Sequence, residues 1–300
     1  MQKYLVLILS FFFYTSGFGQ SDSIESRIIL IGDAGKLNFG RQPVVDAARD
    51  SIPLDKKTIV LFLGDNLYKT GLPEDFLPQY KAARAVLDSQ INIAKGTDAK
   101  LIFIPGNHDW TDGSINGLEN VERQEAYINE LGNKNVLFVP SDGCVGPVEY
   151  KVNKDVTLVL FDSQWFIQKG EKPGVESDCS IKTEDQFYEE LDRILGNNKD
   201  KLVILACHHT LKSYGAHGGY YTLKQHIFPF TDLNPNLWIP LPVIGSIYPI
   251  ARGVFGTPED LHYPAYQNMI NHIEKLVQPY PNILFVAGHE HNLQLIKDSS

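Results

Sequence analysis

The 300-residue sequence is poor in cysteine and in basic side chains, and it contains no long apolar run. Three cysteines cannot form a disulfide framework, and at most one bridge is possible. With 27 Lys and Arg against 36 Asp and Glu, the formal charge of −9 excludes a nucleic-acid binder that works by bulk positive charge. No stretch reaches the roughly 20 apolar residues of a membrane-spanning helix. A content of 43% hydrophobic and 21% charged residues is typical of a globular chain.

The first residues have the pattern of an export signal. Lys3 precedes an apolar run over residues 4–14, and the small residues Gly17 and Gly19 follow with the spacing of a cleavage site. Because the run is too short to span a bilayer, we expect a signal peptide over residues 1–19, with an uncleaved anchor as the alternative. The mature protein would then be extracytoplasmic, which means periplasmic, at the cell surface or secreted.

Export would permit one disulfide bond. Cys144 and Cys179 both lie in loop-like sequence rich in Gly, Pro, Ser and Asp, and they could pair. Cys207 ends the apolar run LVILAC and is more typical of a buried small hydrophobic residue. None of the three has the surroundings of a nucleophile.

Apolar runs alternate with amphipathic stretches along the chain. The runs are rich in β-branched residues and nearly unbroken, as expected of strands buried on both faces, and they read RIILIG, TIVLFLG, KLIFIPG, the paired YKVNKDVTLVLFD, KLVILAC and NILFVAG. Helical spacing occurs over 73–95, 116–131, 183–195 and 264–277. This alternation predicts an α/β fold in which helices cover the sheet.

Residues of the kind that bind metals directly follow five of the apolar runs. The five segments are GDAG at 32–35, GDNLY at 64–68, GNHD at 106–109, CHH at 207–209 and GHEH at 288–291. Open α/β sheets bind ligands beyond the carboxyl ends of their strands, so we expect these segments to converge on one pocket. A single Gly-Asp pair after a strand is usually a turn, but five such segments in chain order favour a binding site.

The candidate ligands are carboxylates, an amide oxygen and several imidazoles. Without a thiolate, this set suits Fe, Zn or Mn and does not suit a structural zinc site. There are more ligands than one tetrahedral metal can use. A pair of metals about 3.5–4 Å apart with a bridging carboxylate fits better, and such pairs act on the attacking and leaving oxygens of a displacement at phosphorus.

The order GDAG, GDNLY, GNHD, ACHH and GHEH resembles the calcineurin-like metallophosphoesterases, from about Arg27 to Leu293. Within these segments, GDNLYKTGLP and ACHHTLKSYGAHGG are similar to the purple acid phosphatases, particularly the small tartrate-resistant type. The resemblance implies a four-layer α/β/β/α sandwich. It also implies a hydrolase that acts on phosphoric ester bonds in the manner of an acid phosphatase.

The resemblance further implies a ligand set for two metal ions. The first ion would be bound by Asp33, Asp65, Tyr68 and His291. Asp65 would bridge to the second ion, which Asn107, His208 and His289 complete. A tyrosinate at Tyr68 favours Fe(III), paired with Fe(II), Zn(II) or Mn(II). Alternatively, Tyr68 only packs in its loop, and the other six ligands hold two divalent metals.

Catalytic roles are predicted for two histidines and one aspartate. His108 lies between Asn107 and Asp109, and an imidazole oriented by the Asp109 carboxylate could serve as a general acid or bind phosphate. His217 matches the family's second histidine on the substrate side. His209 is more typical of a structural residue. The remaining histidines outside the motifs are expected at the surface or in packing positions, and they are His226, His262 and His272.

We therefore predict hydrolysis of phosphate monoesters by attack of a metal-bound hydroxide, without a covalent intermediate. The expected partner is a small phosphorylated substrate. Binding to nucleic acid is not expected. A phosphodiesterase or nucleotide hydrolase that uses the same site is the main alternative. A non-catalytic, metal-bound interaction domain is the other, because a fold alone does not establish a function.

The sequence departs from the family pattern in two places. Residues 218–263 form a long insert rich in proline and aromatic residues, too apolar for a disordered segment. A lid or specificity wall is the first interpretation, and a partner or membrane contact and plain packing are the alternatives. The sequence also stops nine residues after His291, where family members continue with further strands. We expect the metallophosphoesterase domain over residues 20–300 to lack its last strands and to continue beyond residue 300.

Overall fold

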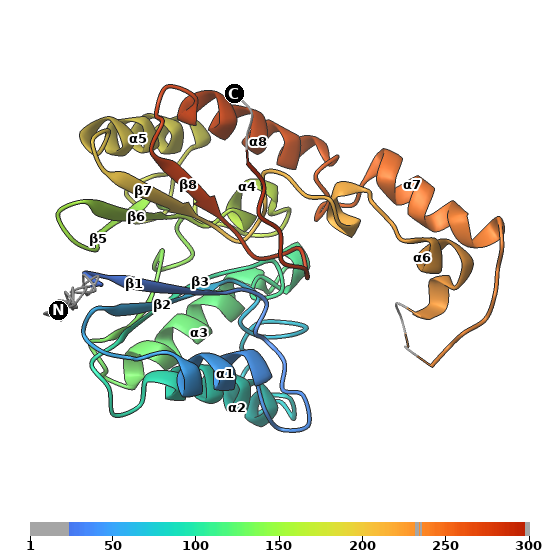
Figure 1. Ribbon diagram of the computed structural model, residues 1–300, viewed down its shortest axis with the longest axis horizontal. Coiled ribbons are helices and arrows are strands. Elements are labelled where there is room, and N and C mark those ends of the chain that lie inside the picture. The colour runs from blue at the N-terminus through green and yellow to red at the C-terminus, as the bar shows by residue number, and fades with distance from the viewer. Residues whose placement is uncertain (1–23, 232–233, 235, 298–300) are drawn as a thin grey trace, which may run out of the picture.

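Two four-stranded sheets lie face to face at the centre of the molecule, and helices cover the outer face of each sheet (Figure 1). This is the α/β/β/α order that the resemblance implies. The computed structural model describes residues 24–231, 234 and 236–297. The signal peptide expected over residues 1–19 lies outside the described residues, and the expected continuation beyond residue 300 stays a prediction.

The first sheet comes from the first half of the chain and is parallel throughout. Its strands, in sheet order, are β1 (Arg27–Ile31), β2 (Thr58–Leu63), β3 (Lys100–Ile104) and β4 (Val136–Phe138). The register places Ile31 beside Phe62 and Leu63 beside Ile104, so the carboxyl ends of these strands lie at one edge. The sequence predicts the first three strands. β4 has only three residues, which is too short for a periodic signal.

The second sheet begins with the predicted antiparallel pair and continues in parallel. Its strands, in sheet order, are β5 (Val148–Lys151), β6 (Val156–Leu160), β7 (Leu202–Ala206) and β8 (Ile283–Val286). Leu160 lies beside Ala206, and Ala206 lies beside Val286, so these three strands also end at one level.

Alternate residues of one strand serve two different cores. In β2, Ile59, Leu61 and Leu63 face the other sheet, whereas Val60 and Phe62 face the helices. The core between the sheets also contains Leu158, Leu160, Ile204 and Ala206. Because β2 is buried on both faces, it needs the unbroken apolar run that its sequence shows.

Three helices cover each sheet. They are α1 (Pro43–Ser51), α2 (Tyr80–Ile91) and α3 (Gly117–Glu130) on the first sheet, and α4 (Gln164–Ile167), α5 (Glu184–Asn197) and α8 (Pro264–Val277) on the second. The helices expected over 116–131, 183–195 and 264–277 are confirmed within two residues. The helix expected over 73–95 is shorter, because Pro78 disfavours helical backbone in the residue before it and α2 begins only after this proline.

The cysteines follow the pattern that the sequence allows. Cys144 and Cys179 form a disulfide between the loop that joins β4 to β5 and the loop that joins α4 to α5. Cys207 is a buried free thiol at the end of β7, and its burial raises the pKa of the thiol. A buried, protonated thiol is a packing residue and not a nucleophile.

Residues 219–257, here called the arm, leave the layers and extend to one side of the molecule (Figure 1). The arm contains α6 (Leu223–Ile227), α7 (Ile247–Phe255) and short 3₁₀ turns at Pro229–Thr231 and Ile244–Ser246. It forms most of the insert that the sequence marks at 218–263. The residues that follow it, including Glu259 and Asp260, return to the body.

The core between the sheets should dominate stability. We expect Leu61→Ala to lower the free energy of unfolding by about 2–5 kcal/mol, because Leu61 is fully buried between the sheets. Urea denaturation followed by circular dichroism would measure the loss. The control is Leu202→Ala at the exposed start of β7, which should cost about 1 kcal/mol or less. Equal losses at the two positions would contradict the assigned packing.

Candidate metal centre

The five segments that the sequence singles out meet at one edge of the two sheets. They follow β1, β2 and β3 in the first sheet and β7 and β8 in the second. Asp33, Asp65 and His289 have φ values of 57°, 52° and 69°, so the chain turns sharply as it leaves three of these strands. A Cβ at Gly64 would collide with the ring of His208, so this glycine permits the close approach of the two sheets.

One group of candidate ligand atoms joins the two sheets. The Asn107 Oδ1 atom lies 2.9 Å from His208 Nε2 and 3.2 Å from His289 Nδ1, and these two nitrogens are 3.2 Å apart. All three side chains are buried. The structure therefore brings together the three residues that the resemblance assigns to the second metal alone.

The outer hydrogen bonds of these residues determine which atoms face inward. His208 Nδ1 lies 2.8 Å from the carbonyl of Leu63, and His289 Nε2 lies 2.7 Å from the carbonyl of Glu259, so both of these outer nitrogens are donors. The Asn107 Nδ2 amine donates to Asp112. When both rings are neutral, as histidine ligands of a metal are, three lone-pair atoms face one another. A cation satisfies such an arrangement, so these residues fit a metal ion.

A second group of candidate ligand atoms lies beside the first. Ligand atoms of Asp33, Asp65 and His291 lie within 4.8 Å of one another. The Tyr68 hydroxyl is 2.9 Å from His291 Nε2 and 3.4 Å from Asp33 Oδ1. The four residues that the resemblance assigns to the first metal are thus also brought together.

Asp65 lies between the two groups. Its Oδ1 atom accepts a hydrogen bond of 2.9 Å from the His108 backbone and lies 3.4 Å from His208 Nε2. Burial opposes ionisation of Asp65, but the neighbouring His208 and His108 outweigh burial and lower its pKa. An ionised carboxylate between two groups of ligands is the arrangement that a bridging ligand requires.

The electrostatics of the first group differ from those of Asp65. Burial raises the pKa of Asp33, and the nearby Asp65 carboxylate adds to this rise. Burial together with Asp65 and Asp33 also raises the pKa of Tyr68 far above its usual value. Two carboxyl groups and a phenol are therefore crowded at this edge, and a bound cation would stabilise their ionised forms.

Asp109 does not contact the His108 imidazole, so the expectation that it orients this ring is wrong. Both Asp109 oxygens are taken up by the chain around them, through bonds from Gly106, Asn66 and Leu67. Asp109 therefore supports the two loops that carry Asp65 and Asn107, and it does not orient His108. The reason is that Asp109 is fully buried beneath these loops, where unpaired backbone donors need an acceptor.

His108 has another carboxylate partner. Its Nδ1 atom lies 2.9 Å from the carbonyl of Lys69 and 3.2 Å from Asp112 Oδ1. Its Nε2 atom faces Asp65, with 3.9 Å to Oδ2. The ring thus presents one nitrogen to the candidate metal centre. Asp112 lies four residues after His108 in a non-helical turn, with a φ of 51°, so no helical spacing in the sequence marks it as the partner.

His217 is held by a pair of residues that the sequence analysis does not identify. Its Nδ1 atom lies 3.0 Å from Asp260 Oδ1, and Arg252 donates to both oxygens of Asp260. The His217 ring centre is 4.0 Å from that of His289, so His217 borders the metal centre. Glu290, within the GHEH segment, accepts the backbone N–H of His217 and the Ser213 hydroxyl.

His209 is buried and lies beside the ligand groups. Its Nδ1 atom is 2.8 Å from the Ser163 hydroxyl and its Nε2 atom is 3.2 Å from Glu259 Oε2. Burial raises the pKa of Glu259 to about 7. Glu259 and Asp260 come from the end of the insert, where no sequence pattern marks them as site residues.

Two of the histidines outside the motifs have packing contacts. His272 stacks on Tyr188, and His226 lies 3.1 Å from the Ser246 hydroxyl within the arm.

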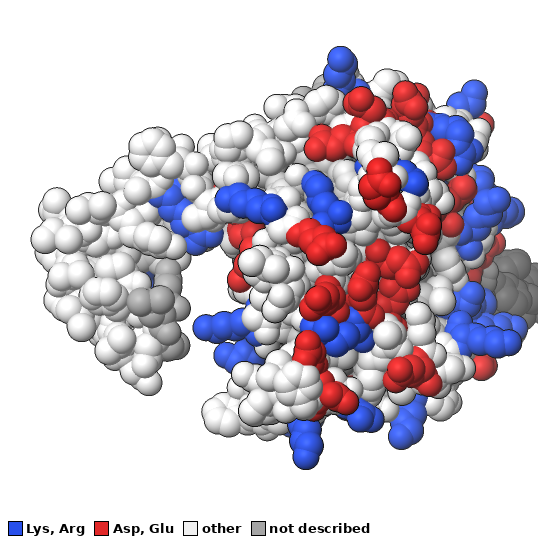
Figure 2. Space-filling model, turned by 180° about the vertical axis from the view of Figure 1, so that it is seen from behind, with Lys and Arg blue, Asp and Glu red and all other residues white. Residues whose placement is uncertain are grey.

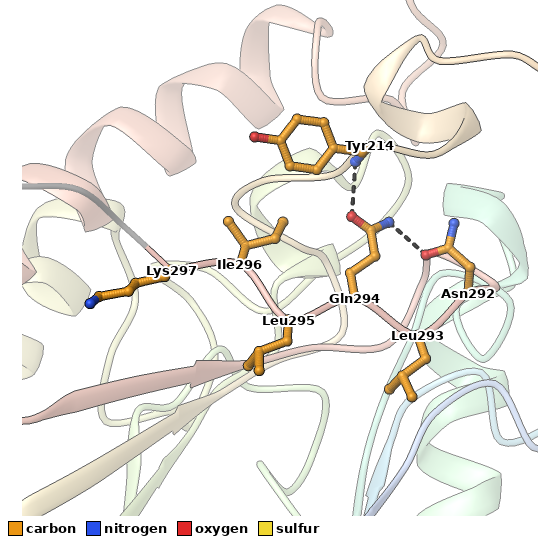
Figure 3. Close-up of a pocket in the computed structure, with 7 residues that line it drawn as sticks. All are labelled: Tyr214, Asn292, Leu293, Gln294, Leu295, Ile296 and Lys297. Atoms are coloured by element: carbon orange, nitrogen blue, oxygen red, sulfur yellow. Dashed lines mark hydrogen bonds between the residues drawn. The ribbon is translucent and has the colours of Figure 1, made fainter.

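A separate hollow of about 500 Å³ lies near His291, between Tyr214 and the last described segment (Figure 3). Gln294 accepts from the Tyr214 N–H and donates to Asn292 there. The residues that line this hollow include none of the candidate metal ligands.

Comparison with known proteins gives a family and remote structural likenesses. The family model of calcineurin-like phosphoesterase matches residues 26–293. Among solved structures, one described as "GAP50 the anchor in the inner membrane complex of Plasmodium" has 15% sequence identity and a TM-score of 0.48, over 91% of this chain and 68% of that chain. This likeness is too low to bear on function. No curated protein matches the sequence.

Bound metal should depend on the inward-facing nitrogens. We expect His208→Ala to lower the metal content by about one ion per chain, because it removes one of the three converging lone pairs. Elemental analysis of protein loaded with zinc and then desalted would measure this change. His272→Ala, which removes a stacked histidine far from the motifs, should leave the content unchanged. Unchanged metal in His208→Ala would contradict the assignment.

The ion pair behind His217 should also give a pH-dependent stability. Burial opposes ionisation of Asp260, but its bonds to His217, Arg252 and Thr257 hold the pKa of this carboxyl well below its usual range. A lowered pKa in the folded state stabilises the protein above about pH 4 and loses this contribution as the pH falls. The Tm difference between wild type and Asp260→Asn should therefore be largest near neutral pH and shrink toward about pH 2. Asp75→Asn, at an exposed position, is the control and should show little difference at any pH.

Proposed function

The chain belongs to the calcineurin-like phosphoesterase family, and on this premise we propose that it hydrolyses phosphate monoesters at a centre of two metal ions. The family itself indicates metal-dependent hydrolysis of phosphoesters. One observation carries the finer proposal: two groups of ligand atoms lie on either side of the ionised Asp65 carboxylate. This arrangement suits two ions that share a ligand.

The chain's own residues would hold the ions and the substrate. Asp33, Tyr68 and His291 would bind one ion, and Asn107, His208 and His289 the other, with Asp65 between them. Bound metal ions supply Lewis acidity toward a phosphoryl oxygen and offset its negative charge. The proposed reaction needs no covalent intermediate on a serine or cysteine. The free thiol of Cys207 is buried and does not have the character of a nucleophile.

His108 and His217 would handle protons. His108 donates from Nδ1 toward Lys69 and Asp112, which leaves Nε2 on the side of Asp65. Asp260 accepts a hydrogen bond from Nδ1 of His217. The Nε2 atom of His217 would then face the oxygen of the substrate's leaving group. Asp260 and Arg252 act through His217 and are positioning residues in this proposal.

Tyr68 supports a relationship to the purple acid phosphatases. Its hydroxyl points to His291 and Asp33, which is the position that a phenolate ligand would need. We therefore propose Fe(III) for the ion beside Tyr68, with Fe(II), Zn(II) or Mn(II) for the other. The disulfide between Cys144 and Cys179 agrees with the proposed export to an extracytoplasmic compartment.

Hydrolysis of p-nitrophenyl phosphate beside its bis-ester would test this function. We expect protein loaded with iron and zinc to turn over the monoester, and Asp65→Asn to abolish turnover because the shared ligand is weakened. His217→Asn should lower kcat by about 10²–10⁴-fold, the usual contribution of a general acid. His226→Asn, in the arm, is the matched control and should retain activity.

The same assay distinguishes the alternatives. Preferential turnover of the bis-ester would support a phosphodiesterase or nucleotide hydrolase that uses the same residues. A folded protein that holds two metal ions and hydrolyses neither ester would refute the proposed monoesterase and favour a metal-bound interaction domain.

A further inference from the structure

The arm exposes most of its apolar side chains. Among the described residues, 27 large hydrophobic side chains are exposed, and 13 of these lie on the arm. No large hydrophobic side chain of the arm's described residues is buried. Hydrogen bonds within the arm order its backbone, among them the bond from the Leu241 N–H to the Ile227 carbonyl and the capping box of α6. The arm therefore has an ordered backbone without a core of its own, and an apolar surface of this size marks an interaction site.

Helix α7 exposes its apolar face, whereas an ordinary surface helix buries it. Ile247, Ile250 and Val254 follow one another at the spacing of one helical face, and they are between 58% and 65% exposed. Phe255, beside them, is 76% exposed. Arg252, the only charged residue of the helix, points back to Asp260 in the body. The apolar face of α7 is thus turned to solvent, and its charge is turned to the protein.

Charge is distributed unevenly between the arm and the body. The arm carries Lys224 and Arg252 against Asp232, which gives 2 − 1 = +1, and the rest of the chain carries 25 − 35 = −10. Residues 233–258 contain no Asp or Glu. In Figure 2 the visible face of the arm is largely uncharged, whereas acidic side chains gather on the body. The arm is the part of this acidic protein that an anionic surface would repel least.

We propose that the arm docks on a lipid surface, with α7 lying flat at the interface. The exposed set combines aliphatic side chains with Trp238 and Tyr248, the two residue types that favour the headgroup region. A protein interface normally has a polar rim and about one hydrogen bond per 100–200 Å². The arm offers little of this, because Arg252 is paired with Asp260 and Lys224 lies over the Trp238 ring.

The dimensions of the arm fit docking and not spanning. α7 has nine residues, or about 14 Å of helix, against the roughly 30 Å of a bilayer core. No helix in the described part of the chain has both the length and the apolar character needed to cross a membrane. A short helix with an exposed apolar face can bury this face at the boundary between headgroups and acyl chains.

The position of the tryptophans permits a direct test. Trp110 and Trp165 are 0% and 3% exposed in the body, whereas Trp238 is 56% exposed on the arm. Vesicles of phosphatidylcholine, alone or mixed in equal parts with phosphatidylglycerol, would be titrated into the mature protein. We expect a blue shift of the fluorescence and its quenching by brominated lipid. Both effects should disappear in Trp238→Phe, while this variant still sediments with vesicles.

Matched double substitutions would measure the contribution of α7. We expect Ile250→Ser with Val254→Ser to weaken vesicle binding by about tenfold or more, because two apolar side chains no longer enter the lipid. The control, Val44→Ser with Val175→Ser, changes two side chains of similar exposure on the body and should bind as wild type does. Binding should persist in high salt, because apolar contact and not charge supplies it.

Three results would overturn the proposal. They are failure of the wild type to sediment with either vesicle, equal weakening by the two double variants, and a concentration-dependent dimer that shields Trp238 and binds no vesicle. The last would assign the arm to a second copy of this chain. None of these measurements requires hydrolytic activity, so their outcome is independent of the proposed phosphatase reaction.

Discussion

Three lone-pair atoms point at one another between two sheets, and much of the structure serves to hold them there. Asn107, His208 and His289 lie on different strand ends, and their inward atoms are within 3.2 Å of one another. Each is fixed from behind by a hydrogen bond, to Asp112, to the Leu63 carbonyl and to the Glu259 carbonyl respectively. With both rings neutral, this arrangement is unfavourable unless a cation is bound. The apolar core between the sheets must therefore keep the two halves aligned.

The sequence predicts those parts of this arrangement that are local or periodic. α8 begins and ends where its amphipathic spacing does, and the strands buried on both faces appear as apolar runs. The candidate ligands are recognisable because each follows a strand. α1 and β4 escape prediction because nine and three residues carry too little periodicity. Metal roles inferred from the resemblance remain predictions, although the residues concerned lie together.

The features that the sequence could not reveal depend on contacts between distant segments. Asp260 reaches His217 across 43 residues, and no motif surrounds it. Asp109 adjoins His108 in the chain, yet it turns beneath the loops, and Asp112 meets the imidazole instead. Neighbours in sequence are thus poor guides to which carboxylate orients a histidine. Buried backbone N–H groups of the two loops need an acceptor, and Asp109 supplies it, so Asp112 is the aspartate that contacts His108.

Arg252 belongs to the arm, but its partner Asp260 belongs to the body. Anyone who shortens the protein by deleting its apolar arm, in order to improve its behaviour in solution, would also remove the cation from a buried carboxylate. The loss of one partner from a buried ion pair leaves an uncompensated charge next to the histidine at the candidate site. A truncation that keeps α7 from Arg252 onward, or one that also replaces Asp260 by asparagine, would avoid this fault. A truncation chosen for solubility would therefore remove the whole arm, whereas the ion pair with Asp260 requires that Arg252 be kept.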